Sequence, residues 1–412
     1  MTFDYLIEIR PFIEKLKLKQ KMASLKKDFH LKKSQKIPHL TLIYNFYPKI
    51  SNYKLAELIK QTATKYENLS FVYDGWDFKE TEKGHVFTFK ITPSEQLKEF
   101  RRELYDNIKG VIVENPKVQD FNKATKDNFW YHTTIATSVH EKKAKKIDKI
   151  IHNKKSKLEK FGSLFTQTTE KISHTRKPLF FPSEVVRIPI LRSGKIVYEY
   201  DKFTNEVLTR RDALSPKDKK RTLSSFRHKR GIEVIPTTVK NSNQTWFISD
   251  THFDHSNIIG YCARPFTDVQ EMNRIILDNW NYTIGKDDRV YFLGDLAYHS
   301  RTRSNYWLRK LNGNIEFIRG NHDRDTRNTK THEKIAYKGY EFLLTHDPEE
   351  LPIRWKGWII HGDKHNNSLQ TFPLVNWEKK TVNVCVELIN YIPISIDKII
   401  ELIENKNKKS HF

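Results

Sequence analysis

The sequence of 412 residues has few of the features that mark secreted or membrane-embedded proteins. It contains two cysteines, Cys262 and Cys385, which are too few for a disulfide framework and suit a reducing cytoplasm. No apolar run approaches the ~18 residues that a membrane-spanning helix needs, and the N-terminus lacks the pattern of a signal peptide. We therefore expect a cytoplasmic protein with no membrane partner, and nothing in the sequence indicates an obligate protein partner.

Acidic residues are in the minority, because 50 Asp and Glu face 73 Lys and Arg, which gives a net charge of +23. This excess favours a polyanionic partner, nucleic acid above all, over a merely lysine-rich solvated surface. Residues 204–240 are basic and poor in large apolar side chains, so they are either a basic linker or arm, or a helix packed on one domain. Their cationic residues include Lys217, Lys219, Lys220, Arg221, Arg227, Lys229 and Arg230.

A chain of this length is expected to hold two or three domains, and residues 1–203 alternate predicted strands with helices. Apolar positions at helical spacing predict a helix at 94–110, capped by Ser94, and a basic helix at 140–153. Residues 184–201 predict a hairpin that turns at Ser193-Gly194. Aromatic and β-branched runs predict strands at 3–9, 39–47, 69–78, 85–92 and 129–139.

Two of these strands open with the pattern His-x-Thr, which also hints at an internal duplication. His39 and Thr41 share one face of the first strand, and His132 and Thr134 share one face of the second. Two facing imidazoles could act as a metal-free acid–base pair, and the hydroxyls could bind phosphate oxygens. The alternative is two histidines that simply pack beside hydroxyls. Nearby aromatic residues (Trp76, Trp130 and Tyr131) could stack a base, although core packing is the simpler interpretation.

Residues 241–400 repeat a pattern of apolar strand, polar loop and helix, which predicts a layered α/β domain followed by a tail at 401–412. Because strand ends meet at one edge of such a sheet, we expect the polar clusters that follow the strands to converge. Their members are Asp250, His252, Asp295, Asn321, His322, Asp323, His346, His361, Asp363 and His365. These residue types bind Mn, Fe, Zn or Mg. Two such ions would neutralise a phosphate ester and generate hydroxide at neutral pH, with Asp295 as the candidate bridge.

In this order, the segments SDTHFDHSNI, FLGDLA, RGNHDR, LLTHDP and HGDKHN resemble the motifs of the calcineurin-like metallophosphoesterases, over residues 245–400. The resemblance implies two divalent ions, Mn above all, with Fe, Zn, Ni and Mg as alternatives. It places Asp250, His252 and His365 on the first metal, Asp295 between the metals, Asn321 and His346 on the second metal, and His322 at the phosphate, oriented by Asp323.

The last motif departs from the family pattern Gly-His-x-His, because residues 362–365 read Gly-Asp-Lys-His. Asp363 stands where a second-metal histidine is expected, and a carboxylate there would favour a harder metal such as Mn or Mg. Alternatively, His361 could swing in, or the second metal could bind weakly. His255 either touches phosphate or satisfies the turn after Asp254.

Residues 3–203 resemble the 2H phosphoesterases, a family that includes proteins called 2′-5′ RNA ligases and 2′,3′-cyclic phosphodiesterases. The resemblance rests on the paired His-x-Thr motifs and the duplicated layout. It implies a duplicated fold without metal, with His39 and His132 catalytic and Thr41 and Thr134 as phosphate ligands. Which histidine is acid and which is base is left open.

The chain is thus expected to combine an α+β and an α/β domain in one phosphoric ester hydrolase. Our leading hypothesis is the processing of RNA ends: the first domain opens a 2′,3′-cyclic phosphate, and the second removes the resulting 2′-phosphate. The partner would be RNA with 2′,3′-cyclic phosphate or 2′-phosphate ends. One alternative is the degradation of 2′-5′-linked or cyclic signalling nucleotides, and another is an RNA-end-binding module attached to a metallophosphatase.

Overall fold

The computed structural model describes residues 3–152, 180–233, 243–298, 301–323, 330–350 and 355–405. The chain divides into two compact units, residues 1–222 and 223–412. The predicted domains 1–203 and 241–400 each fall within one unit, and residues 204–240 span the division.

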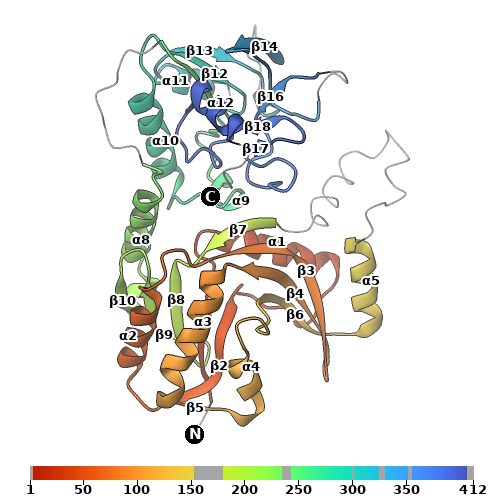
Figure 1. Ribbon diagram of the computed structural model, residues 1–412, viewed down its shortest axis with the longest axis vertical. Coiled ribbons are helices and arrows are strands. Elements are labelled where there is room, and N and C mark those ends of the chain that lie inside the picture. The colour runs from red at the N-terminus through yellow and green to blue at the C-terminus, as the bar shows by residue number, and fades with distance from the viewer. Residues whose placement is uncertain are drawn as a thin grey trace. The chain divides into compact units, whose positions relative to one another are not determined.

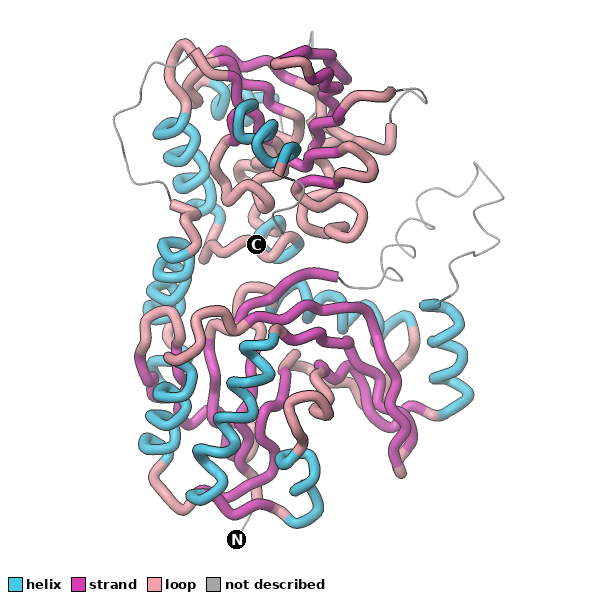
Figure 2. The backbone as a smooth tube through the Cα atoms, in the orientation of Figure 1, coloured by secondary structure: helices cyan, strands magenta, loops and turns pink. Residues whose placement is uncertain are grey.

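The first unit contains two antiparallel sheets flanked by helices (Figures 1 and 2). Six strands have the order β10-β9-β8-β1-β2-β5, and four have the order β6-β4-β3-β7. The bounds of the six are β1 Tyr5–Ile9, β2 Leu40–Pro48, β5 Ile112–Glu114, β8 Arg187–Arg192, β9 Lys195–Asp201 and β10 Glu206–Thr209. The bounds of the four are β3 Ser70–Thr81, β4 Gly84–Pro93, β6 His132–Val139 and β7 Phe180–Glu184. The two His-x-Thr strands, β2 and β6, therefore belong to different sheets.

The helices of this unit are α1 Lys15–Asp28, α2 Asn52–Ala63, α3 Glu95–Ile108, α4 Gln119–Lys123 and α5 Glu141–His152, with short 3-10 turns at Lys109–Val111 and Pro116–Val118. The predicted helix at 94–110 is confirmed as α3, and the hydroxyl of Ser94 accepts a hydrogen bond from the amide of Leu97. The predicted basic helix is α5. The predicted hairpin is β8–β9, and both Ser193 and Gly194 have positive φ at its turn.

The described part of the basic segment contains the strand β10 and two helices, α7 at Arg210–Leu214 and α8 at Pro216–Lys229. Arg187 of β8 is buried and donates to the backbone carbonyl of Asp218 and to the hydroxyl of Thr222 in α8. Further along α8, the buried Arg227 pairs with Glu271 at 3.0 Å, and Glu233 also pairs with it. Two of the cations that could have formed a solvated arm, Arg221 and Arg227, are thus engaged in ion pairs.

The second unit has two sheets built around parallel strands. One has the order β13-β12-β11-β19, and the other has the order β14-β15-β16-β18-β17. The first comprises β11 Thr245–Ile248, β12 Arg289–Phe292, β13 Asn314–Phe317 and β19 Ile394–Ser395. The second comprises β14 His332–Tyr337, β15 Tyr340–Thr345, β16 Trp358–His361, β17 Val375–Asn376 and β18 Thr381–Asn383. The predicted fold class, an α+β domain followed by a layered α/β domain, is confirmed, and the sheets of the first unit are antiparallel.

Helices α9 Ile258–Tyr261, α10 Val269–Thr283, α11 Arg301–Leu308 and α12 Ile396–Glu404 accompany these sheets (Figure 1). Apolar residues of both sheets share one core with α12, including Phe247, Leu344 and Ile360. Burial of this kind contributes about 25 cal/mol per Å² of apolar surface, so the core fixes the strand ends that carry the polar clusters. Within the described ranges, no helix is long and apolar enough to cross a membrane.

Candidate active sites

The predicted metal ligands follow the parallel strands of the second unit. Asp250 lies two residues beyond β11, Asp295 lies three residues beyond β12, and His346 directly follows β15. β11 is parallel to β12 in one sheet and β15 is parallel to β16 in the other, so each sheet presents its polar clusters at the carboxyl ends of these strands. His252 also follows β11, Asn321, His322 and Asp323 follow β13, His361 is the last residue of β16, and Asp363 and His365 follow β16.

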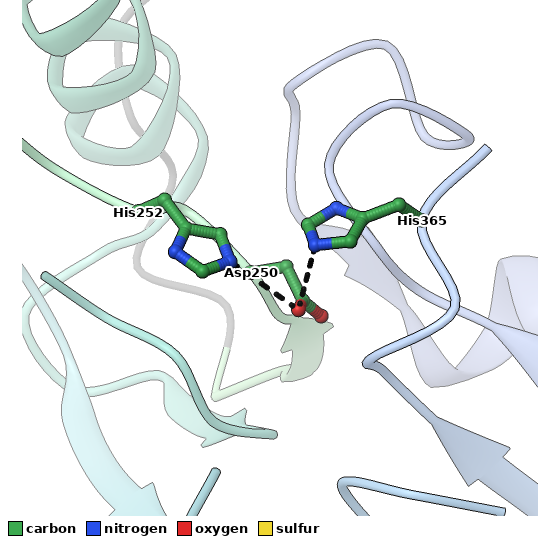
Figure 3. A group of neighbouring side chains, drawn as sticks. All are labelled: Asp250, His252 and His365. Atoms are coloured by element: carbon green, nitrogen blue, oxygen red, sulfur yellow. Dashed lines mark ion pairs between the residues drawn. The ribbon is translucent and has the colours of Figure 1, made fainter. Parts of the chain in front are cut away.

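The first group of ligands consists of Asp250, His252 and His365, whose ligand atoms all lie within 4.8 Å of one another. Oδ1 of Asp250 is 3.8 Å from Nε2 of His252 and 3.5 Å from Nε2 of His365. Figure 3 shows the carboxylate between the two imidazoles, each of which points a ring nitrogen at it. Nε2 of His252 is also 3.5 Å from Oδ2 of Asp295.

The second group consists of Asp250, Asp295 and His346. Oδ2 of Asp295 lies 3.6 Å from Nε2 of His346, so this carboxylate faces a histidine of each group, as a bridging ligand must. Nε2 of His346 is also 3.6 Å from Oδ1 of Asp363, which accepts a hydrogen bond of 2.9 Å from the amide of Asn321. The structure therefore brings Asn321 and Asp363 to the second group.

The chemistry of these residues fits divalent cations. Oδ1 of Asp250 and Nε2 of His252 and of His346 are buried, with no hydrogen-bond partner in the described part of the chain. Burial lowers the pKa of His346, but Asp295 and Asp250 outweigh this effect and raise that pKa to about 10. Burial, with Asp295, also raises the pKa of Asp250. The cluster thus gathers negative charge that a cation can balance, and it leaves the ligand atoms available for that cation.

The backbone at the site is strained in a way that is uncommon for residues other than glycine. Five of the predicted ligands have positive φ: Asp250 (58°), His252 (48°), Asp295 (60°), Asp363 (62°) and His365 (45°). Gly362 also approaches closely, because a Cβ there would lie 2.5 Å from Oδ2 of Asp250. The surrounding packing therefore holds these side chains in place at a cost in local backbone energy.

His361 has a different environment from Asp363. Nδ1 of its buried ring donates a hydrogen bond of 2.9 Å to the carbonyl oxygen of Gly362, and the ring lies edge-on to Phe372. Of the two alternatives left open by the sequence, Asp363 has its carboxylate 3.6 Å from Nε2 of His346. The buried Nε2 of His361 has no hydrogen-bond partner in the described part of the chain, and neither residue belongs to the groups of candidate ligands found among the described residues.

Asp323 joins two loops of the site. Its carboxylate accepts hydrogen bonds from the backbone amides of Asp295 (2.7 Å), Leu296 (3.2 Å) and Gly320 (2.8 Å). These described contacts hold the loop that carries Asp295, and the predicted role of Asp323 in orienting His322 stays a prediction. His322 is nonetheless close, because its backbone amide donates to Oδ1 of Asp295 at 2.9 Å.

His255 takes part in the turn that follows the first motif. Its Nδ1 accepts a hydrogen bond of 3.1 Å from the amide of Ile258. Its ring lies 4.0 Å from that of Tyr298 and 5.6 Å from that of His252. The turn interaction is therefore present, and the ring also lies beside a candidate metal ligand.

Two residues that the sequence reasoning missed support the first group. Both carboxylate oxygens of Glu387 lie 3.1 Å from Nδ1 of His365, which leaves Nε2 directed at Asp250. The buried Arg264 pairs with Glu387 at 2.7 Å and donates to the backbone carbonyls of Asp250 and Thr251. A carboxylate that binds the distal nitrogen of a metal-ligating histidine fixes its ring and increases its basicity. The signal in the sequence was a glutamate inside an otherwise apolar segment.

We expect Glu387→Gln to weaken metal binding at the group formed by Asp250, His252 and His365 by about 10–100-fold. The reason is that the amide cannot supply the negative charge behind His365. Isothermal titration of the metal-stripped full chain with Mn²⁺ measures this change. Glu271→Gln is the matched control, since Glu271 is also buried and pairs with an arginine, Arg227. Equal weakening in both variants would show that any lost buried charge has this effect.

The first unit places its two histidines in equivalent settings. Nδ1 of His39 lies 3.0 Å from the carbonyl of Ile37, and Nδ1 of His132 lies 2.9 Å from the carbonyl of Trp130. Because a carbonyl can only accept, each Nδ1 carries the hydrogen and each Nε2 retains a lone pair when the ring is neutral. The repeated arrangement agrees with the predicted duplication.

The His-x-Thr spacing has the expected effect on burial. His39 and Thr41 are half-buried on either side of the buried Leu40, so the pair shares the more open face of β2. On β6, His132 and Thr134 are likewise half-buried, and the residue between them is fully buried. Each sheet thus presents one imidazole and one hydroxyl together.

His132 lies in a confined environment. Its ring stacks on Trp130 with centroids 3.6 Å apart, and the ammonium of Lys79 lies 4.5 Å above the same indole. Burial lowers the pKa of His132 to about 4, with smaller contributions from His39 and Lys79 in the same direction. The imidazole is therefore neutral at pH 7, and His39 is close enough to affect its charge.

His39 faces an acidic residue that the sequence reasoning did not select. Oε2 of Glu8, on the neighbouring strand β1, lies 4.0 Å from Nε2 of His39. The other oxygen of Glu8 accepts a hydrogen bond of 2.5 Å from Arg10. Glu8 also lies opposite Thr41 in the register of β1 and β2.

The three aromatic residues near this site differ in accessibility. Trp76 and Tyr131 are buried members of the hydrophobic core, as the simpler interpretation held. Trp130 is half-buried and stacks on His132.

Taken together, the two sites define a chain with two phosphoesterase domains of different chemistry. A family model described as the 2′-5′ RNA ligase superfamily matches residues 7–162, and one described as calcineurin-like phosphoesterase matches residues 244–401. The chain therefore contains a 2′-5′ RNA ligase superfamily domain followed by a calcineurin-like phosphoesterase domain.

Individual relatives each match part of the chain. An uncharacterised protein of Methanocaldococcus jannaschii is 47% identical over 162 residues, which are 39% of this chain and 90% of that protein. The gene 66 protein of Mycobacterium phage L5 is 32% identical over 137 residues, which are 32% of this chain and 65% of that protein. A crystal structure of a protein of unknown function from Aquifex aeolicus is 28% identical, with a TM-score of 0.31, over 39% of this chain and 99% of that chain.

Proposed function

We propose that this chain heals RNA ends by two successive hydrolyses. The observation that carries this proposal is that one chain holds two histidines with matching backbone hydrogen bonds and, separately, a cluster of candidate metal ligands. The first step opens a terminal 2′,3′-cyclic phosphate, and the second removes the 2′-phosphate that the first step leaves. The products are a terminus with two free hydroxyls and inorganic phosphate.

In the first step, a water oxygen bonds to phosphorus while the bond between phosphorus and O3′ breaks. Nε2 of His132 accepts the proton from water, because its low pKa keeps it neutral at pH 7. Nε2 of His39, beside the carboxylate of Glu8, supplies a proton to O3′. The hydroxyls of Thr41 and Thr134 donate hydrogen bonds to the non-bridging oxygens, where negative charge develops.

In the second step, the bond between phosphorus and O2′ breaks, and a water oxygen takes its place. Two divalent cations, Mn²⁺ in our proposal, would supply Lewis acidity and a hydroxide nucleophile when bound. Asp250, His252 and His365 would hold one cation, and Asn321, His346 and Asp363 the other, with Asp295 shared. His322, whose backbone is held against Asp295, would donate the proton to O2′.

RNA is the polyanion that we propose for the basic surface. Arg221 and Arg227 of α8 are already paired with carboxylates. By contrast, Lys32, Lys33 and Lys36 are exposed. Their segment is hydrogen-bonded to β6, the strand that carries His132. They could hold the phosphates that precede the terminus. The two free, buried cysteines suit the cytoplasm as the compartment of this reaction.

A chelation experiment tests the division of labour. RNA ending in a 2′,3′-cyclic phosphate is incubated with the full chain, with and without EDTA, and the products are separated. We expect ring opening in both samples and phosphate release only with metal. If EDTA stops both steps, the first domain is not an independent catalyst.

The same assay decides between the proposed function and its rivals. Faster turnover of small cyclic or 2′-5′-linked nucleotides than of RNA ends would favour the degradation of signalling nucleotides. Tight binding of RNA ends without any ring opening would favour an RNA-end-binding module.

A further inference from the structure

Lys364 lies next to the aspartate that replaces the family's histidine. Its side chain is only 13% exposed, and its ammonium contacts three carboxylates. The distances are 2.8 Å to Oδ1 of Asp347, 2.8 Å to Oδ2 of Asp363 and 3.0 Å to Oε2 of Glu349. A cation is thus built into the structure beside one of the candidate ligands of the second metal.

The two oxygens of Asp363 have different partners. Oδ1 faces the cluster, where it accepts from Asn321 at 2.9 Å and lies 3.6 Å from Nε2 of His346. Oδ2 faces Lys364. The backbone of Asp363 is fixed independently, because its amide donates to Oδ2 of Asp250 at 3.0 Å. The orientation of Oδ1 therefore does not depend on Lys364 alone.

We propose that Lys364 is a counter-charge that makes the second metal position the weaker of the two, so that this position fills last and exchanges with free metal. An ammonium beside the ligand repels an incoming divalent cation and competes with it for the charge of Asp363. The inference rests on the two-metal centre of the proposed function and does not depend on the RNA substrate.

The first metal position differs in our proposal, because its ligands are held more firmly. Its histidine His365 is braced by Glu387 at 3.1 Å, and Arg264 anchors Glu387 and the backbone of Asp250. It offers two imidazoles, whereas the second position offers one imidazole with oxygen donors and the amide of Asn321. Such donors favour hard cations such as Mn²⁺ and Mg²⁺ over Zn²⁺. The centre is therefore asymmetric in both affinity and metal preference.

Metal titration of the full chain tests this inference. The metal-stripped protein is titrated with Mn²⁺ by calorimetry, and bound metal is counted after equilibrium dialysis. We expect two steps in the wild type, the second at least tenfold weaker than the first. Lys364→Met should tighten the second step by about tenfold, because the repulsive charge is lost while Asn321 still orients Asp363. The first step should stay within about twofold.

Two further variants make the result specific. Lys330→Met is the matched control, because Lys330 also pairs with two carboxylates, Glu316 and Glu333, in the same unit. It should leave both steps unchanged. Asp363→His should raise the ratio of Zn²⁺ to Mn²⁺ affinity in the second step by about tenfold.

Several results would overturn the inference. These are a single bound ion in the wild type, two steps of equal affinity, or a second step that Lys364→Met weakens or leaves unchanged. Thermal melting of each variant identifies misfolding, and Lys364→Gln, which is also uncharged, must then reproduce the tightening. If two ions load as expected but no phosphate leaves RNA ends, the proposed function fails and the inference stands.

Discussion

Replacing His132 with alanine should lower the rate of cyclic phosphate opening by roughly 10²–10⁴-fold, because the proton acceptor is lost. Removal of a 2′-phosphate from RNA that already carries one should be unchanged, since we assign that reaction to the second unit. Rates of both steps on matched RNA substrates measure the effect. His140→Ala is the control, because His140 is an exposed histidine just beyond the end of the same strand.

The pH dependence of the wild type provides an independent check on His132. Burial lowers its pKa to about 4 from the ordinary value of 6.5. The imidazole therefore remains a neutral base well below pH 6.5 and becomes protonated only as the pH falls through about 4. We expect the acidic limb of ring opening near pH 4. An acidic limb near pH 6.5, absent in His132→Ala, would contradict the assigned role.

Replacing Asp295 with asparagine should have the largest effect in the second unit. The carboxylate faces His252 at 3.5 Å and His346 at 3.6 Å, so its loss removes a ligand of both metal positions at once. Metal ions contribute several kcal/mol of transition-state stabilisation, and a loss of ~4 kcal/mol is about 10³-fold in rate. We therefore expect phosphate release to fall by roughly 10³-fold or more, with fewer than two ions bound per chain.

Ring opening should continue at the wild-type rate in Asp295→Asn, so the 2′-phosphate intermediate should accumulate. Asp287→Asn serves as the control, because Asp287 is an exposed carboxylate shortly before β12. If Asp295→Asn also stopped ring opening, the two sites would not act independently. If phosphate release persisted with one ion bound, Asp295 would not be the bridge.

The sequence predicted the helices, the strands and those site residues that local sequence patterns identify. The His-x-Thr strands followed from alternation alone, and the predicted metal ligands followed from polar clusters after apolar strands. Asp363 is an instructive case: the motif placed it two residues after His361, and only the direction of each side chain distinguishes the two candidates. His361 turns its Nδ1 towards the carbonyl of Gly362, whereas Oδ1 of Asp363 faces His346.

The residues that sequence reasoning missed act through partners far away in the chain. Glu387 supports His365, and Arg264 joins Glu387 to the backbone of Asp250. Glu8 faces a histidine thirty-one positions later only because β1 and β2 pair. No local pattern distinguishes such a charged residue from a solvated one, and the buried Arg227 shows the same difficulty within a segment that read as a basic arm.

The contacts of Arg187 bear on where the first folding unit ends. The guanidinium of this buried arginine is satisfied by Asp201 and Glu199 and also by Ala213, Asp218 and Thr222. A shortened chain that stopped at residue 203 would keep both carboxylates but would strip the guanidinium of its partners in α7 and α8. The family match ends at residue 162, whereas the first compact unit extends to residue 222, so we expect a piece that ends at residue 203 to be less stable than one that ends at residue 222. The stretch between the two catalytic domains is thus, for its first half, a structural part of the domain that precedes it.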